Sequence, residues 1–85
     1  MLSIKVLGPG CANCERVYQV AKSAVQMAGA EEATITKVTD RTEYPKYGLL
    51  YTPGLVINGK LVCGGRIPNQ TEVATWIINA LAAEE

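Results

Sequence analysis

The sequence of 85 residues contains no histidine, and this absence removes several kinds of chemistry. Without an imidazole the chain has no base for Cys-His or Ser-His catalysis and no histidine metal ligand. It also lacks the side chain that ordinarily titrates near neutral pH. We therefore expect any chemistry of this protein to depend on its thiols.

The sequence also lacks net charge and long hydrophobic runs. Eight Lys and Arg residues balance eight Asp and Glu residues, so no basic surface for nucleic acid or anionic membranes is predicted. The apolar stretches are far shorter than the roughly 20 residues of a membrane span, and residues 1–5 are typical of a strand, not of an export sequence. We expect one soluble, monomeric, cytoplasmic domain over residues 1–85, with no nucleic-acid or membrane partner.

The hydrophobic pattern predicts alternating strands and helices in the first half of the chain. Residues 2–7 and 33–39 are rich in strand-forming residues, and the second run alternates with polar residues as an edge strand does. Between them, small apolar residues recur at helical spacing over residues 11–28, and Gly29 is a suitable C-cap. Residues 40–48 predict a short helix that is distorted by Pro45.

The second half predicts a hairpin and a final helix. Asn58-Gly59 supplies the positive φ angles of a tight turn between strands at residues 55–57 and 60–63. Asn69 and Glu72 are spaced as a reciprocal helix cap. The apolar face expected for that helix consists of Val73, Trp76, Ile77, Ala80 and Leu81. The order β-α-β-α-β-β-α predicts an α/β fold, a four-stranded mixed sheet with helices on both faces.

Three cysteines, an odd number, favour a cytosolic redox or metal role over a secreted disulfide framework. Cys11 and Cys14 follow a predicted strand and a Gly-Pro-Gly turn, at the start of a predicted helix. The helix N-terminus favours the charged thiolate of Cys11 and lowers its expected pKa. Cys14 shares the expected buried stripe with Val17, so it should be less exposed than Cys11.

Metal binding is the main alternative for this pair. A structural zinc site needs four ligands, and only Cys63 and no histidine could add to Cys11 and Cys14. A soft ion or arsenite bound by two or three thiolates fits better. Cys63 is expected to be a buried small apolar residue on the same strand face as Leu61, or else the third thiolate of such a site.

Several features together resemble a known family. They are the strand followed by a Cys-x-x-Cys helix, Thr52-Pro53 before a strand, the Asn58-Gly59 hairpin, and Gly64-Gly65 before the last helix. Over essentially its whole length the chain resembles small, glutaredoxin-sized, redox-active disulfide proteins with the thioredoxin-like fold. The resemblance implies that Cys11 attacks a protein disulfide and that Cys14 resolves the mixed disulfide. It also implies a flavin thioredoxin-reductase type of electron donor, with no cofactor and no resident metal.

The resemblance further implies where substrate binds. In the family, the proline that Pro53 matches is cis and faces the disulfide, and the backbone at Thr52 pairs with an extended substrate peptide. Tyr47 and Tyr51 flank this segment and could line a substrate surface or simply pack. The candidate substrate-binding residues are Thr52, Pro53, Gly10 and Tyr51.

Departures from the family pattern limit what the resemblance implies. Gly10 and Asn13 replace the Trp and Pro that precede the two cysteines in thioredoxins, and Lys5 stands where thioredoxins have a buried acid. Lys5 and Asn13 are therefore candidate modulators of the thiols, although Lys5 could instead lie along the sheet with its head in water. Arg66 follows Gly64-Gly65 where glutaredoxins have an acidic residue, which favours protein disulfides over glutathione. A glutathione-dependent glutaredoxin and a soft-metal module remain the alternatives.

Overall fold

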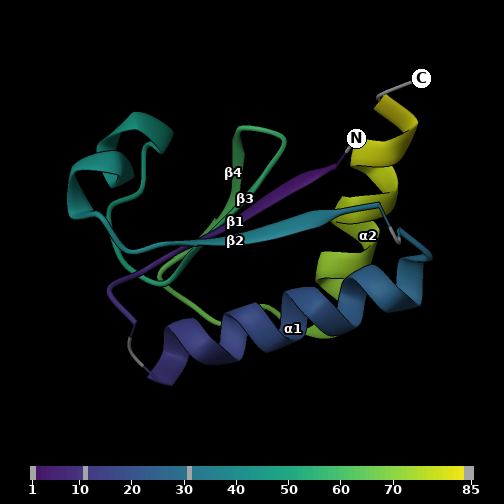
Figure 1. Cartoon of the computed structure of the whole chain (residues 1–85), viewed down its shortest axis with the longest axis horizontal. Coiled ribbons are helices and arrows are strands. Elements are labelled where there is room, and N and C mark those ends of the chain that lie inside the picture. Colours follow the sequence, from purple (N-terminus) through teal and green to yellow (C-terminus); the bar gives the residue numbers. More distant parts are fainter. Residues whose placement is uncertain (1, 11, 31, 84–85) are drawn as a thin grey trace.

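The structure, a computed structural model, describes residues 2–10, 12–30 and 32–83. The elements along the chain are β1 (Ser3–Leu7), α1 (Ala12–Ala28), β2 (Thr34–Val38), the 3-10 helix η1 (Arg41–Tyr47), β3 (Gly54–Ile57), β4 (Lys60–Gly64) and α2 (Gln70–Ala83). Figure 1 shows the sheet in the middle, with α1 below it, α2 toward one end and η1 toward the other. The predicted order of elements is confirmed. No helix in the described part of the chain is long and apolar enough to cross a membrane.

β1 lies in the interior of a four-stranded sheet with the order β2-β1-β3-β4. It pairs parallel with β2 and antiparallel with β3, and β3 pairs antiparallel with β4. The parallel pair needs α1 as a crossover because its strands run the same way, whereas a tight turn suffices for the antiparallel β3–β4 pair. The predicted mixed sheet is confirmed, with β2 at an edge.

Each face of the sheet is covered by an apolar layer. α1 and α2 pack on one face, where they bury Ile4 and Val6 of β1. On the other face, Tyr44 of η1 packs against Leu7 and Val56. The buried residues of the larger layer are Leu2, Ile4, Val6, Val17, Ala21, Ala24, Ala30, Leu55, Ile57, Cys63, Val73, Ala74 and Ile77. The prediction of helices on both faces is therefore confirmed.

η1 is the short, distorted helix predicted after residue 40. The Asp40 carboxylate caps it by accepting hydrogen bonds from the N–H of Thr42 at 2.9 Å and from its hydroxyl at 2.7 Å. Pro45 inside the helix cannot donate a backbone hydrogen bond, and Gly48 ends the helix with a φ of 79°.

The hairpin turn between β3 and β4 has the predicted geometry. Asn58 has a φ of 50° and Gly59 a φ of 81°, so both central residues are left-handed. The Asn58 side chain also accepts a hydrogen bond from the N–H of Ser3 at 2.9 Å. The turn is thereby attached to the start of β1.

The prediction that Cys63 shares a sheet face with Leu61 is wrong, because β4 contains an irregularity. Leu55 pairs with Cys63, but the next residue, Val56, pairs with Leu61, so the register shifts between the two pairs. Leu55 and Val56 point to opposite faces of the sheet, and so do their partners. Cys63 packs in the layer that faces α1 and α2, whereas Leu61 packs against the layer that faces η1.

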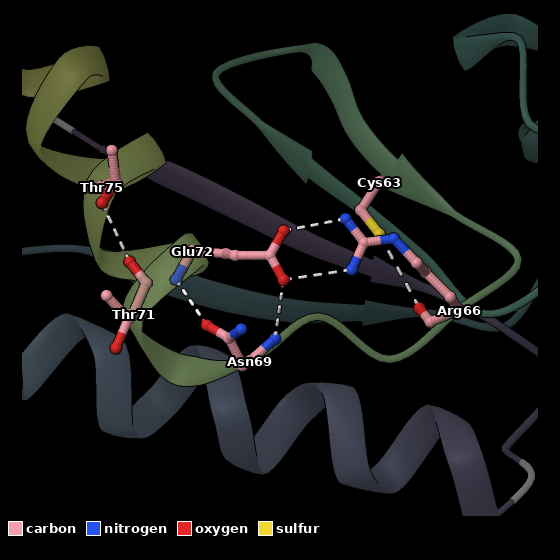
Figure 2. Close-up of polar contacts among 6 residues, drawn as sticks. All are labelled: Cys63, Arg66, Asn69, Thr71, Glu72 and Thr75. Atoms are coloured by element: carbon pink, nitrogen blue, oxygen red, sulfur yellow. Dashed lines mark hydrogen bonds and ion pairs between the residues drawn. The ribbon is translucent and has the colours of Figure 1, made fainter.

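The start of α2 has the predicted reciprocal cap. The N–H of Glu72 donates to Oδ1 of Asn69 at 2.8 Å, and the N–H of Asn69 donates to Oε1 of Glu72 at 3.3 Å (Figure 2). Arg66 donates two further hydrogen bonds to the Glu72 carboxylate, at 2.9 and 3.2 Å. The cap therefore joins the loop after β4 to α2.

Replacing Asn69 by Ala is expected to lower the free energy of unfolding by about 1 kcal/mol, because the Glu72 N–H loses its partner. Urea denaturation followed by circular dichroism measures this change. Gln70→Ala, which removes an exposed amide one residue later, is the control and should change stability little. Equal losses in the two variants would contradict the role of the cap.

Candidate active site

The end of β1 leads through a short turn toward α1, which contains Cys14. Gly10 has a φ of 91°, a left-handed conformation that favours glycine. Cys11, the predicted nucleophile, lies outside the described residues. Asn13 is exposed, whereas Cys14 is only 5% exposed. α1 therefore places Cys14 on its buried side with Val17, as the helical spacing predicted.

Cys14 packs against Gly8. A Cβ atom on Gly8 would collide with Sγ of Cys14 and would lie 3.0 Å from its Cβ. The N–H of Gly8 donates to the carbonyl of Val38 in β2 at 3.0 Å, which holds the backbone in this position. Sequence analysis identified Gly8 only as part of a turn, and nothing in the sequence indicated its contact with Cys14.

A cavity of about 20 Å³ borders Cys14, lined by Val6, Gly8, Gly10, Cys14, Glu15, Lys37 and Thr39. Glu15 and Lys37 form an ion pair there at 2.6 Å, and Nζ of Lys37 lies 4.5 Å from the ring centroid of Tyr18. The hydrogen bond from Lys37 lowers the pKa of Glu15 below its ordinary value, and the same bond raises the pKa of Lys37. Both side chains are about half exposed, so the pair contributes little to stability.

The Thr52-Pro53 peptide bond is cis, which confirms that prediction. Pro53 is buried, and its carbonyl accepts a hydrogen bond from the N–H of Gly65 at 2.9 Å. Thr52 is exposed, and no hydrogen bond joins it to another described residue. Tyr51 beside it is 74% exposed. Substrate binding by these residues and by Gly10 stays a prediction.

The pairing of β1 with β3 brings this segment to the start of α1. Leu7, the last residue of β1, pairs with Gly54, the first residue of β3. The chain after Leu7 and the chain before Gly54 therefore meet at the same end of the sheet (Figure 1). Pro9 and Thr52 accordingly line one groove.

Lys5 has a partner on the sheet face that η1 covers. Its Nζ donates to the hydroxyl of Tyr47 at 2.9 Å and lies 5.5 Å from the centroid of that ring. Tyr47 is half-buried and packs against the same layer, so packing is the interpretation that the structure supports for this tyrosine. An influence of Lys5 or Asn13 on the thiols stays a prediction.

Cys63 is a buried thiol. It is 7% exposed, and its Sγ donates to the carbonyl of Arg66 at 3.8 Å (Figure 2). Burial raises the pKa of the Cys63 thiol, and the positive charge of Arg66 offsets part of that rise. Within the described ranges, no group of three or more Cys, Asp or Glu side chains could hold a metal ion.

Comparison with known proteins shows the family. Residues 2–78 match the family described as thioredoxin domain. The chain is 33% identical over 73 residues to a thioredoxin of Methanothermobacter thermautotrophicus, a match that covers 86% of this chain and 94% of the relative. It is 36% identical over 73 residues to a thioredoxin of Methanocaldococcus jannaschii, covering 86% and 83%. The chain therefore belongs to the thioredoxin family, as its resemblance implied, and this membership supports a redox function.

Replacing Gly8 by Ala should lower the free energy of unfolding of the reduced protein by about 1–3 kcal/mol, because the added methyl group collides with Cys14. The loss should be smaller in a Cys14→Ala background, where the colliding sulfur is gone. Urea denaturation of the wild type, the two single variants and the double variant measures this coupling. Additive losses would show that the two residues do not share this contact.

Proposed function

We propose that this protein is a thiol–disulfide oxidoreductase that reduces disulfides of other proteins. The observation that carries the proposal is the placement of Cys14, buried in the first turn of α1 and packed against the end of β1, in a chain of the thioredoxin family. A helix start favours a thiolate, and the three-residue spacing keeps the two sulfurs of a Cys-x-x-Cys pair on one side of the helix.

The proposed reaction is an exchange of disulfides. The Cys11 thiolate attacks one sulfur of the target disulfide, a bond forms between these two sulfurs, and the other target sulfur leaves as a thiolate. The Cys14 thiolate then attacks Sγ of Cys11, which releases the second target sulfur. The target gains two electrons and becomes a dithiol after protonation, while Cys11 and Cys14 become a disulfide. A flavin reductase of the thioredoxin-reductase type is the proposed donor that restores the dithiol.

The target peptide is proposed to lie along the exposed residue Thr52 and to pair with its backbone next to Pro53. Gly10 has no side chain to restrict the approach, and exposed Tyr51 offers apolar contact. Asn13, exposed in the first turn of α1, and Lys5 are proposed to modulate the thiols. Cys63 is proposed to take no part in the exchange, because it is buried and burial raises the pKa of its thiol.

Glutathione receives less support as the substrate than a protein disulfide does. Arg66 follows Gly64-Gly65, and its guanidinium is bound to Glu72. Glu72 is the carboxylate beside Arg66 that could neutralise the glutathione ammonium, and it is already paired with Arg66. The reducing cytoplasm is the proposed location, because it keeps an unpaired thiol such as Cys63 reduced.

Insulin reduction tests the proposed function. The wild type should reduce insulin with a flavin thioredoxin reductase as donor and much more slowly with glutathione. Cys14→Ser should stop turnover and accumulate a mixed disulfide on Cys11, detectable by mass spectrometry, because the resolving thiol is missing. Cys63→Ala is the matched control and should keep most of the activity.

A different outcome would favour one of the alternatives. Efficient turnover with glutathione alone would indicate a glutaredoxin. A loss of activity in folded Cys63→Ala as large as that in Cys14→Ser would indicate that three thiols act together. Binding of arsenite without reduction of any disulfide would indicate a soft-metal module.

A further inference from the structure

A groove beside Thr52 is lined by one charged and several apolar side chains that have no role in the thiol exchange itself. It has a volume of about 420 Å³ and is lined by Pro9, Arg41, Tyr44, Leu50, Tyr51 and Thr52. We call it the Arg41 groove. Pro9 lies in the turn between β1 and α1, and Thr52 precedes Pro53. The groove therefore begins where the target peptide is proposed to lie.

The walls of the Arg41 groove are open apolar side chains over a fixed floor. Leu50 is 86% exposed and Tyr51 is 74% exposed, so two adjacent residues of the groove present apolar surface to a partner. Tyr44 is buried, and its hydroxyl donates to the carbonyl of Val38 at 3.3 Å. The groove therefore presents a preformed surface.

Arg41 supplies the formal charge of the groove. Within the part of the chain that the structure describes, its exposed guanidinium forms no ion pair. The neighbouring Asp40 carboxylate caps η1 through Thr42 and does not line the groove. Glu43 is paired with Lys46 at 2.7 Å. The guanidinium is thus available to a carboxylate of a partner, which it could bind through two hydrogen bonds.

A second groove, on the α1 side of the site, does not carry charge of a single sign. It is lined by Ala12, Glu15, Arg16, Gln19, Val20 and Ile67. Glu15 and Arg16 give it both signs of charge, so it does not favour one charge on a partner. Charge selection by the site is therefore expected from the Arg41 groove.

We propose that the Arg41 groove makes this protein prefer target disulfides flanked by acidic residues, with Arg41 binding the carboxylate and Leu50 and Tyr51 contacting apolar side chains nearby. This specificity rests on the proposed reductase function. The expected partner is a peptide that carries acidic and apolar side chains on either side of its disulfide.

The test uses three short peptides, each as a disulfide-linked dimer through its single cysteine. They differ only in the residue two positions before and two positions after the cysteine, which is Glu, Gln or Lys. Rates of reduction by the reduced protein are divided by the rates with dithiothreitol, which corrects for the reactivity of each peptide. The Glu peptide should react about two- to fivefold faster than the Gln peptide, as expected for one exposed ion pair. Added salt should reduce this preference.

Arg41→Gln should abolish the preference, and Arg41→Glu should make the Lys peptide the better substrate. Lys22→Gln, which removes an exposed charge of α1 outside the groove, should keep the wild-type preference. Circular dichroism verifies that each variant is folded. An unchanged ratio of Glu to Gln rates in folded Arg41→Gln would overturn the proposal.

Bis(2-hydroxyethyl) disulfide, a small neutral substrate, separates this proposal from the proposed function. Wild type and Arg41→Gln should reduce it at the same rate, because it has no carboxylate for Arg41 to bind. If neither protein reduces this reagent or any peptide, the reductase function is wrong and the specificity that rests on it is wrong too.

Discussion

The close approach of Gly8 to Cys14 is the contact on which the candidate site depends. Gly8 follows β1 directly and is bound to β2 through Val38, so its backbone cannot withdraw. The first turn of α1 can come this close only because Gly8 has no side chain. The contact fixes how deeply Cys14 is buried. It thereby also fixes how the first turn of α1, and Cys14 with it, sits on the end of the sheet.

The antiparallel pairing of β1 with β3 supplies the other half of the site. Because Leu7 pairs with Gly54, the turn into α1 and the Thr52-Pro53 segment leave the sheet at the same end. One interior strand, β1, therefore positions both the turn toward α1 and the segment before β3 (Figure 1). Residues at the edges of this site, such as Arg41, take no part in the pairing of the strands, so they can differ without affecting it.

Local patterns in the sequence predicted much of the fold, and contacts between distant residues account for what was missed. The Asn58-Gly59 turn and the Asn69–Glu72 cap were predicted because each depends on neighbours in the chain. The cis bond at Pro53 followed from family resemblance. The shift that separates Cys63 from Leu61 could not be predicted, because it arises from pairing with β3. The contact of Gly8 and the groove around Arg41 likewise exist only after the elements pack.

The rate at which each thiol reacts tests the central claim most directly, namely that one reactive cysteine is backed by a buried resolving cysteine. The reduced protein would be treated briefly with iodoacetamide at neutral pH, and each cysteine quantified by mass spectrometry of its peptide. The account predicts that Cys11 is labelled well before Cys14 and Cys63, and that all three react alike in denaturant. Preferential labelling of Cys14 or Cys63 in the folded protein would contradict it.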